Sequence, residues 1–439
     1  MRILKVVSLM LFIAISDCGL CQSSTSFLQM NNPVIRVLIS DSTADALITP
    51  TSPFSARTLE GEEILEVPPG LEISISRGDN SVILRDNASS YTTEALCMEP
   101  LDTDGSFILQ KAGLDEKNPG RSYEGRLEIF PGEGGMLEVI IVLPMEKYLM
   151  GVVPYEIGPD SPIEAMCAQA VAARSEAFVA LVTRKYAGKH HDICSDVNCQ
   201  VFRGNERRST GSDEAVTRTC GTVLLFEGQP VSAFYASNCG GHSEDIRNVW
   251  GDRSQEKSYW NSTGFDGKGM SNLDLTKEDD FLKWLDSSPD VFCNHEKYTT
   301  PAWTHKNFRW TREVEAGDLT KWISEIRDIG RVTAMRPVKR GVSGRMIEVE
   351  FIGEKGTLIV GPELKIRRLF KPSLRSAAFI IDPQGPQNRP DRFILRGAGS
   401  GHGVGMCQTG AIGMANQGKS FQDILRHYFP RAEIRTLYK

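Results

Sequence analysis

The segment 163–183 most constrains how this chain can fold. Between Glu164 and Arg184 the only charged residues are Arg174 and Glu176, and the rest are mainly alanine and larger apolar residues. A helix of this composition is expected to be buried, and a buried guanidinium needs a partner. The stretch Tyr-Leu-Met-Gly-Val-Val-Pro-Tyr-Glu ends at Glu156 just upstream. We therefore expect Arg174 to face Glu156, or a group bound beside it.

The residues before this segment carry signals for the start of a helix. Ser161 is the expected N-cap, Pro162 the first helical residue, and Glu164 completes a capping box. The helix is expected to run to about Lys185, where basic residues suit a helix C-terminus.

The alternation of short apolar runs and helical segments predicts an α+β fold with mixed sheets, a buried Ala-rich helix and a β-rich N-terminal region. A chain of 439 residues exceeds the usual size of one core, so two or three domains are expected. The predicted divisions are a signal peptide (1–21), a β-rich region (22–120), a core carrying the motif-bearing helix (121–254), a helical then β second lobe (255–392), and a glycine-rich loop with a helix that completes the core (393–439).

Several individual elements are predicted. The segments 125–129 and 136–143 flank a Pro-Gly-rich turn and predict a hairpin. Predicted helices are 277–285, 317–327 and 407–416, and predicted strands include 34–39, 71–75, 81–84, 222–226, 231–235, 331–342, 345–352 and 357–360.

The N-terminus predicts export. Arg2 and Lys5 precede an apolar run from Val6 to Ile15 that is short for a membrane span, as in a secretory signal peptide; an uncleaved anchor is the alternative. The expected location is therefore the periplasm or cell envelope. A net charge of −6 without a long basic block argues against a nucleic-acid partner.

Glu156 is the first candidate for chemistry. Gly151 and Pro154 predict an irregular turn around it, and its apolar neighbours would make the carboxyl hold its proton, as a general acid requires. The alternative is a solvated surface glutamate. For Arg174 the alternatives are a substrate clamp and a structural ion pair.

The segment 190–199 contains two histidines and two cysteines. His190, Cys194 and Cys199 are ligand types that suit a structural zinc ion, and a Cys194–Cys199 disulfide is the competing interpretation.

Two glycine-rich loops, 237–243 and 397–405, each contain a histidine. They match no nucleotide-binding pattern, and we expect close backbone packing beside a saccharide groove. The candidate substrate-binding residues are Tyr235, Ser237, Gly240, Gly241, His402 and Gln408.

These motifs, in this order, resemble the stage II sporulation protein D (SpoIID) family over roughly residues 120–435. The segments that carry the resemblance are 148–156, 168–174, 192–202, 237–241 with 249–251, and 401–411 with 427–429.

The resemblance implies a peptidoglycan lytic transglycosylase with Glu156 as its single acid and base and Arg174 as the family's helix arginine. It also implies glycan strands stripped of stem peptides as substrate, no cofactor required for the chemistry, and an N-acetylmuramoyl-L-alanine amidase as a partner. The rival is a non-catalytic glycan-binding enhancer of such an amidase. Two positions depart from the family: Asn198 stands where zinc-binding members have histidine, and Cys407 stands where members usually have serine.

Overall fold

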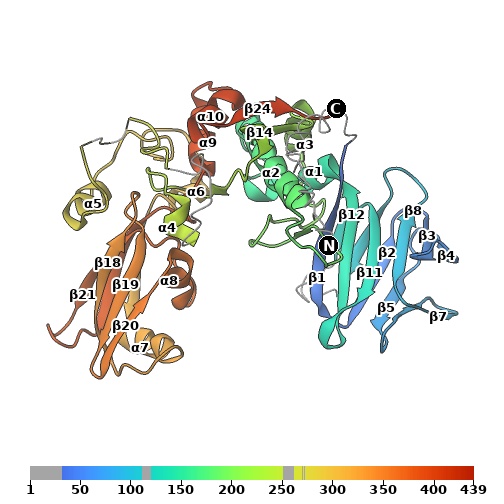
Figure 1. Ribbon diagram of the computed structural model, residues 1–439, viewed down its shortest axis with the longest axis horizontal. Helices are drawn as coiled ribbons and strands as arrows, with labels where there is room; N and C mark the ends of the chain where they lie inside the picture. The colour runs from blue at the N-terminus through green and yellow to red at the C-terminus, as the bar shows by residue number, and fades with distance from the viewer. Residues whose placement is uncertain (1–31, 111–119, 251–261, 269, 271) are drawn as a thin grey trace, which may run out of the picture.

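The computed structural model describes residues 32–110, 120–250, 262–268, 270 and 272–439. The predicted signal peptide lies outside the described residues. Two β-rich lobes flank a layer of helices (Figure 1). The predicted α+β class and the β-rich N-terminal region are confirmed.

The N-terminal lobe contains a seven-stranded and a six-stranded sheet. The first has the order β13-β1-β12-β11-β8-β3-β4 and the second β10-β9-β2-β5-β6-β7. The strands are β1 (Val34–Thr43), β2 (Asp45–Pro50), β3 (Phe54–Thr58), β4 (Glu63–Val67), β5 (Ile73–Arg77), β6 (Val82–Arg85), β7 (Ser90–Thr93), β8 (Leu96–Pro100), β9 (Ser106–Gln110), β10 (Arg121–Glu124), β11 (Arg126–Pro131), β12 (Leu137–Pro144) and β13 (Ile193–Cys194), with a 3-10 turn at Glu133–Gly135. The predicted hairpin is β11–β12, which pairs antiparallel.

The helical layer follows β12 directly and also takes in the last part of the chain. Its helices are α1 (Met145–Glu156), α2 (Ile163–Thr183), α3 (Thr210–Arg218), α9 (Gln408–Asn416) and α10 (Phe421–Tyr428). They pack with the sheet β15-β14-β24 and with the parallel pair β16–β23. These strands are β14 (Thr222–Phe226), β15 (Gln229–Pro230), β16 (Tyr235–Ala236), β23 (Met406–Cys407) and β24 (Glu433–Thr436).

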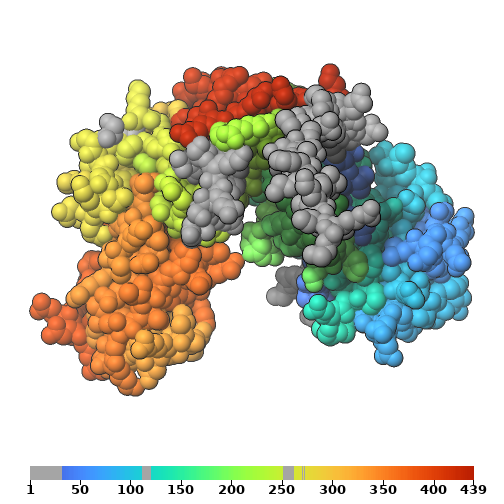
Figure 2. Space-filling view, in the orientation of Figure 1, coloured from blue at the N-terminus to red at the C-terminus, as the bar shows by residue number. Residues whose placement is uncertain are grey.

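The second lobe has its own hydrophobic core, built from residues between Val314 and Leu395. Its sheets have the orders β17-β22-β21 and β18-β19-β20. The elements are α4 (Ile246–Trp250), α5 (Glu278–Leu285), α6 (Ala302–His305), β17 (Arg309–Glu315), α7 (Ala316–Ser324), β18 (Val332–Arg340), β19 (Met346–Gly353), β20 (Gly356–Val360), α8 (Glu363–Leu369), β21 (Phe379–Gln384) and β22 (Arg392–Ala398). Figure 2 shows a wide hollow between this lobe and the N-terminal lobe.

The Ala-rich helix is buried as predicted, but its start differs from the prediction. The Ser161 hydroxyl donates to the carbonyl of Ile157 and does not cap α2. Glu164 instead pairs with Arg218 of α3 and accepts the backbone N–H of Phe421 at the start of α10. The capping-box prediction is therefore wrong, because Glu164 is used to join three helices. Among the described residues α2 alone is long and apolar enough to span a membrane, and most of it is buried inside the protein.

Arg174 pairs with Glu146 and not with Glu156. Its guanidinium is fully buried and makes a bidentate contact with the Glu146 carboxylate. Nε donates to Oε1 at 2.8 Å, and Nη2 donates to Oε2 at 2.6 Å. Tyr438 also donates to the Glu146 carboxylate, at 2.7 Å, and Arg174 donates to the Thr222 carbonyl at 3.0 Å. The predicted pairing with Glu156 is wrong. Both carboxylates lie on α1, but Glu146, near the start of α1, is the one that faces this buried guanidinium.

We predict that Arg174→Met lowers the free energy of unfolding by about 3–5 kcal/mol, because it leaves the Glu146 carboxylate buried without its cation. Urea unfolding measures the loss. The double variant Glu146→Leu/Arg174→Met should lose less than the single variant, since no charge is then left unpaired. Arg218→Met, which breaks a surface pair, should cost at most about 1 kcal/mol. Equal stability of Arg174→Met and wild type would contradict a structural role.

Candidate functional site

Glu156 is the last residue of α1. The predicted irregular turn is wrong here: Tyr148 to Glu156 is helical, and Pro154 lies within the last turn. Proline lacks the N–H that would continue the ladder, and Gly158, at φ 96°, then redirects the chain. The turn residues therefore end the helix, and they leave the Glu156 side chain at its C-terminal end.

The loop after β13 holds the carboxyl in place. The backbone N–H of Val201 donates to Glu156 Oε1 at 2.8 Å. The adjacent Gln200 is buried; its Oε1 accepts from the Tyr148 hydroxyl at 2.8 Å, and its Nε2 donates to the Ala173 carbonyl. This chain of bonds ties the loop to α1 and α2, so the position of Val201 is fixed from both sides.

The other side of the carboxyl is formed by β16 and the start of α9. Tyr235 and Gln408 interact with the charged form of Glu156. Gln408 also donates to Gln169 of α2 at 3.1 Å. The Tyr235 hydroxyl is buried with no partner at hydrogen-bonding distance among the described residues, although it is close enough to Glu156 to affect its ionisation. The structure thus brings Glu156 together with two of the predicted binding residues.

Burial raises the pKa of Glu156 from 4.5 to about 7, despite the hydrogen bond from Val201 and the contacts of Gln408 and Tyr235, which favour the carboxylate. The side chain is nevertheless partly exposed. Its place at the C-terminal end of a helix further disfavours negative charge. Among the described groups that shift this pKa, none is a second carboxyl. A carboxyl that is half protonated near neutral pH is able both to donate and to accept a proton.

The loop of Val201 also contacts the second lobe. Asn198, in the same loop, accepts a hydrogen bond from Arg368 of α8, at 3.5 Å, although α8 belongs to the second lobe. The loop and α8 therefore meet where the two lobes approach each other.

Ser237 and His402 hold residues beside Glu156 in place. The Ser237 hydroxyl accepts from Asn307, and its carbonyl accepts from the N–H and the hydroxyl of Thr409 in α9. Burial lowers the pKa of His402 to about 3, so the ring is neutral; it accepts from the N–H of Val404 and bonds to the backbone of Tyr235. Both residues fix neighbours of Glu156, and their predicted contact with substrate stays a prediction.

Gly240 and Gly241, predicted to contact substrate, are packed in the protein interior. Both glycines are buried, and both have positive φ, 78° and 102°. A Cβ on Gly240 would lie 2.9 Å from the backbone N of Gly399, and one on Gly241 would lie 2.6 Å from the Trp284 ring. Their glycine character is required by interior packing, and their N–H groups bond to Asn238 and Cys239.

Cys194 and Cys199 form a disulfide, with their Cα atoms 5.6 Å apart. His190 lies elsewhere: its ring stacks on Phe130, with centroids 3.9 Å apart, and its Nδ1 contacts Glu138 at 2.8 Å. Bonded sulfurs offer no thiolate to a metal. The disulfide interpretation is confirmed, and the predicted zinc site at these three residues is wrong.

Sequence reasoning missed Gln169, Gln200 and the backbone of Val201. Gln169 is the one amide side chain in the Ala-rich helix and is fully buried. Buried amides need partners, so this residue was a detectable signal for a polar site on α2. The roles of Gln200 and Val201 depend on how a loop folds back onto α1, which no local pattern indicates.

Comparison with known proteins bears on this arrangement. Residues 133–226, which contain α1, α2 and the loop of Val201, match the family model described as stage II sporulation protein (SpoIID). The chain contains a SpoIID domain. The predicted resemblance is confirmed. Residues 244–405, beyond the SpoIID domain, match a domain of unknown function, DUF8618.

Three proteins are similar to this chain over more than the SpoIID match. The stage II sporulation protein D of Bacillus amyloliquefaciens is 27% identical over 307 residues, which cover 66% of this chain and 74% of that protein. The amidase enhancer of Bacillus subtilis is 26% identical over 298 residues, 66% of this chain but 40% of that protein. An uncharacterized protein of Brachyspira hyodysenteriae is 26% identical over 406 residues, 92% of this chain and 93% of its own length.

We predict that Glu156→Gln changes how stability depends on pH. Because folding raises the pKa of Glu156 from 4.5 to about 7, its protonation stabilises the wild type fully below pH 4.5, and this stabilisation is lost as pH rises through 7. The amide side chain of the variant does not titrate. Between pH 4.5 and 8 the wild type should therefore lose up to about 3 kcal/mol relative to the variant in urea unfolding. Parallel stability curves would show that the carboxyl is not desolvated.

Proposed function

We propose that this protein is an exported lytic transglycosylase that cleaves the bond between N-acetylmuramic acid and N-acetylglucosamine in peptidoglycan. The observation that carries the proposal is the environment of Glu156: one partly exposed carboxyl with a pKa of about 7, no second carboxyl acting on it among the described residues, and amide and hydroxyl groups beside it. The SpoIID domain and the names of its relatives support a role in the cell wall.

A single carboxyl suffices for this reaction. Protonated Glu156 donates its proton to the glycosidic oxygen as that bond to the anomeric carbon breaks, and the N-acetylglucosamine side leaves as an alcohol. The resulting carboxylate then takes the proton of the muramyl 6-hydroxyl, whose oxygen attacks the anomeric carbon and closes a 1,6-anhydro ring. Glu156 ends protonated again. Hydrolytic glycosidases need a second acid to act as nucleophile or to activate water, which this route does not.

The surrounding residues have defined tasks in this proposal. The N–H of Val201 steadies the carboxylate between the two proton transfers. Gln408 and Tyr235 favour the carboxylate form of Glu156, so they would stabilise it once it has given up its proton. Arg174 has no part in the chemistry, since it is fully buried against Glu146. Stripped glycan strands remain the substrate that the resemblance implies, and the periplasm or cell envelope remains the expected location.

We predict that Glu156→Gln lowers release of 1,6-anhydro products from peptide-stripped glycan by about 10²–10⁴-fold, because the amide neither donates nor accepts the proton. Mass spectrometry of the products measures the loss. Wild-type kcat/KM should fall as pH rises above 7, where Glu156 becomes ionised. The control is Glu214→Gln, which neutralises an exposed carboxyl on α3 and should leave activity unchanged. Full turnover by Glu156→Gln would remove the assignment.

The second candidate function is enhancement of a wall amidase without glycan cleavage, favoured by the likeness to the Bacillus subtilis amidase enhancer. Purified protein is incubated with intact sacculi, stripped sacculi, or intact sacculi plus an N-acetylmuramoyl-L-alanine amidase. Anhydro ends formed without amidase support the lyase. Faster release of stem peptides with no anhydro ends supports the enhancer.

A further inference from the structure

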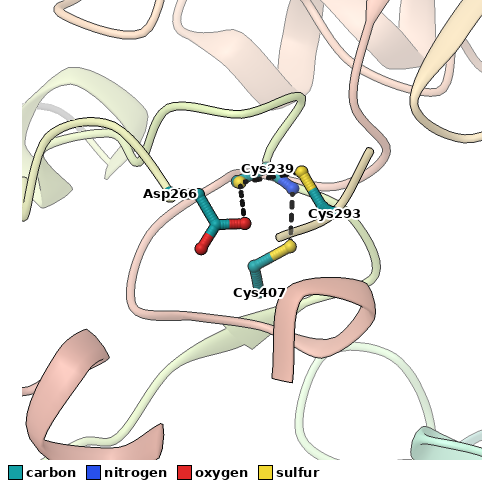
Figure 3. Close-up of side chains that lie close together, drawn as sticks. All are labelled: Cys239, Asp266, Cys293 and Cys407. Atoms are coloured by element: carbon teal, nitrogen blue, oxygen red, sulfur yellow. Dashed lines mark hydrogen bonds between the residues drawn. The ribbon is translucent and has the colours of Figure 1, made fainter. Parts of the chain in front are cut away.

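Three cysteines and an aspartate from four distant segments converge in the interior (Figure 3). Cys239 follows β16, Asp266 lies in the segment 262–268, Cys293 follows α5, and Cys407 ends β23. Each is at most 4% exposed, and their ligand atoms all lie within 4.8 Å of one another. None of the four belongs to the Cys194–Cys199 disulfide.

Two of the distances between these ligand atoms match those of a tetrahedral zinc site, and the rest are at most 4.8 Å. Zinc binds thiolate at about 2.3 Å and carboxylate oxygen at about 2.0–2.2 Å, which puts tetrahedral ligand atoms roughly 3.5–3.8 Å apart. The Sγ atoms of Cys239 and Cys293 are 3.7 Å apart, and Cys239 Sγ lies 3.5 Å from Asp266 Oδ2. The sulfur–sulfur distance is far beyond the about 2.05 Å of a disulfide bond.

The presence of an aspartate distinguishes this cluster from cysteines that are buried only for packing. A carboxylate among thiols in an apolar interior is costly unless a cation neutralises it. The Tyr428 hydroxyl donates to Asp266 Oδ1 at 2.6 Å, and His427 Nε2 lies 3.3 Å from the same oxygen. These partners orient the carboxyl so that Oδ2 faces the sulfurs, as outer partners of metal ligands do.

Backbone N–H groups are aimed at the sulfurs. Those of Cys239 and Gly410 donate to Cys407 Sγ at 3.2 and 3.3 Å, and that of Gly241 donates to Cys239 Sγ at 3.3 Å. Such bonds favour the thiolate, the form of cysteine that binds metal. Gly410 is also required sterically, because a Cβ there would lie 2.5 Å from Asp266 Oδ2.

We propose that Cys239, Asp266, Cys293 and Cys407 bind one structural zinc ion. Three thiolates and one carboxylate close a four-coordinate shell with no position open for a substrate. Binding displaces the protons of the cysteine thiols to solvent, so the free energy of metal binding adds to the stability of the fold.

The zinc joins the DUF8618 segment to the elements that hold the candidate active site. Asp266 and Cys293 belong to the matched residues 244–405, whereas Cys239 and Cys407 lie just outside them. Cys407 immediately precedes Gln408, and β23 pairs with β16, which carries Tyr235. The ion therefore fixes the strand pair that presents both residues to Glu156. Zinc content does not depend on whether the protein cleaves glycan, so the two proposals fail separately.

The test is metal analysis of the purified full chain by plasma mass spectrometry after dialysis into metal-free buffer. We expect one zinc ion per chain, with an X-ray absorption spectrum of three sulfurs at about 2.3 Å and one oxygen at about 2.0 Å. Cys407→Ser and Asp266→Asn should each lose most of the zinc. The matched control Cys194→Ser/Cys199→Ser removes the other cysteine pair and should keep it.

Metal-free wild type with three free thiols, or with a Cys239–Cys293 disulfide found by non-reducing peptide mapping, would overturn the proposal. So would stoichiometric iron, or zinc that is lost only from the Cys194/Cys199 control. If Cys407→Ser fails to fold, the metal content and absorption spectrum of the wild type still decide the outcome.

Discussion

The buried contact between Arg174 and Glu146 is the interaction on which the site depends. It joins the start of α1 to the middle of α2, and Tyr438 from the other end of the chain completes it. Because α1 is held at Glu146, its last residue, Glu156, is held as well. A charge pair that takes no part in the proposed chemistry thus sets where the reactive carboxyl stands. The same burial that keeps α2 in place desolvates Glu156 and raises its pKa.

Local sequence patterns predicted the regular elements well. The β11–β12 hairpin, α5, α7, α9 and the β18–β20 sheet lie close to their expected bounds, since each has a clear apolar period and flanking turn residues. The helix α1 was missed because Gly151 and Pro154 are usually helix breakers. Pro154 is tolerated here because only the last turn follows it, so little of the hydrogen-bond ladder is lost.

The site was predictable only in part. Glu156 and Gln408 are brought together as expected. Of the two carboxylates on α1, however, it is Glu146 and not Glu156 that pairs with Arg174. The segment around Cys194 and Cys199 contained the right residue types for zinc at short spacing, yet holds a disulfide. The cluster of Cys239, Asp266, Cys293 and Cys407 has no short spacing at all. Cys407 was noted only as a departure from the expected family pattern, and in the folded protein it supplies a sulfur to this cluster.

The placement of the last elements determines when the core can close during synthesis. β24 pairs with β14, α10 packs against α2, and Tyr438 reaches Glu146, which precedes it by 292 positions. Until residues 408–438 have been made, one face of the Ala-rich helix and the Glu146 carboxylate stay exposed to solvent. The nascent protein must therefore carry an exposed apolar helix while the whole second lobe is still being translated. The core around the Ala-rich helix therefore closes only after the second lobe has been made.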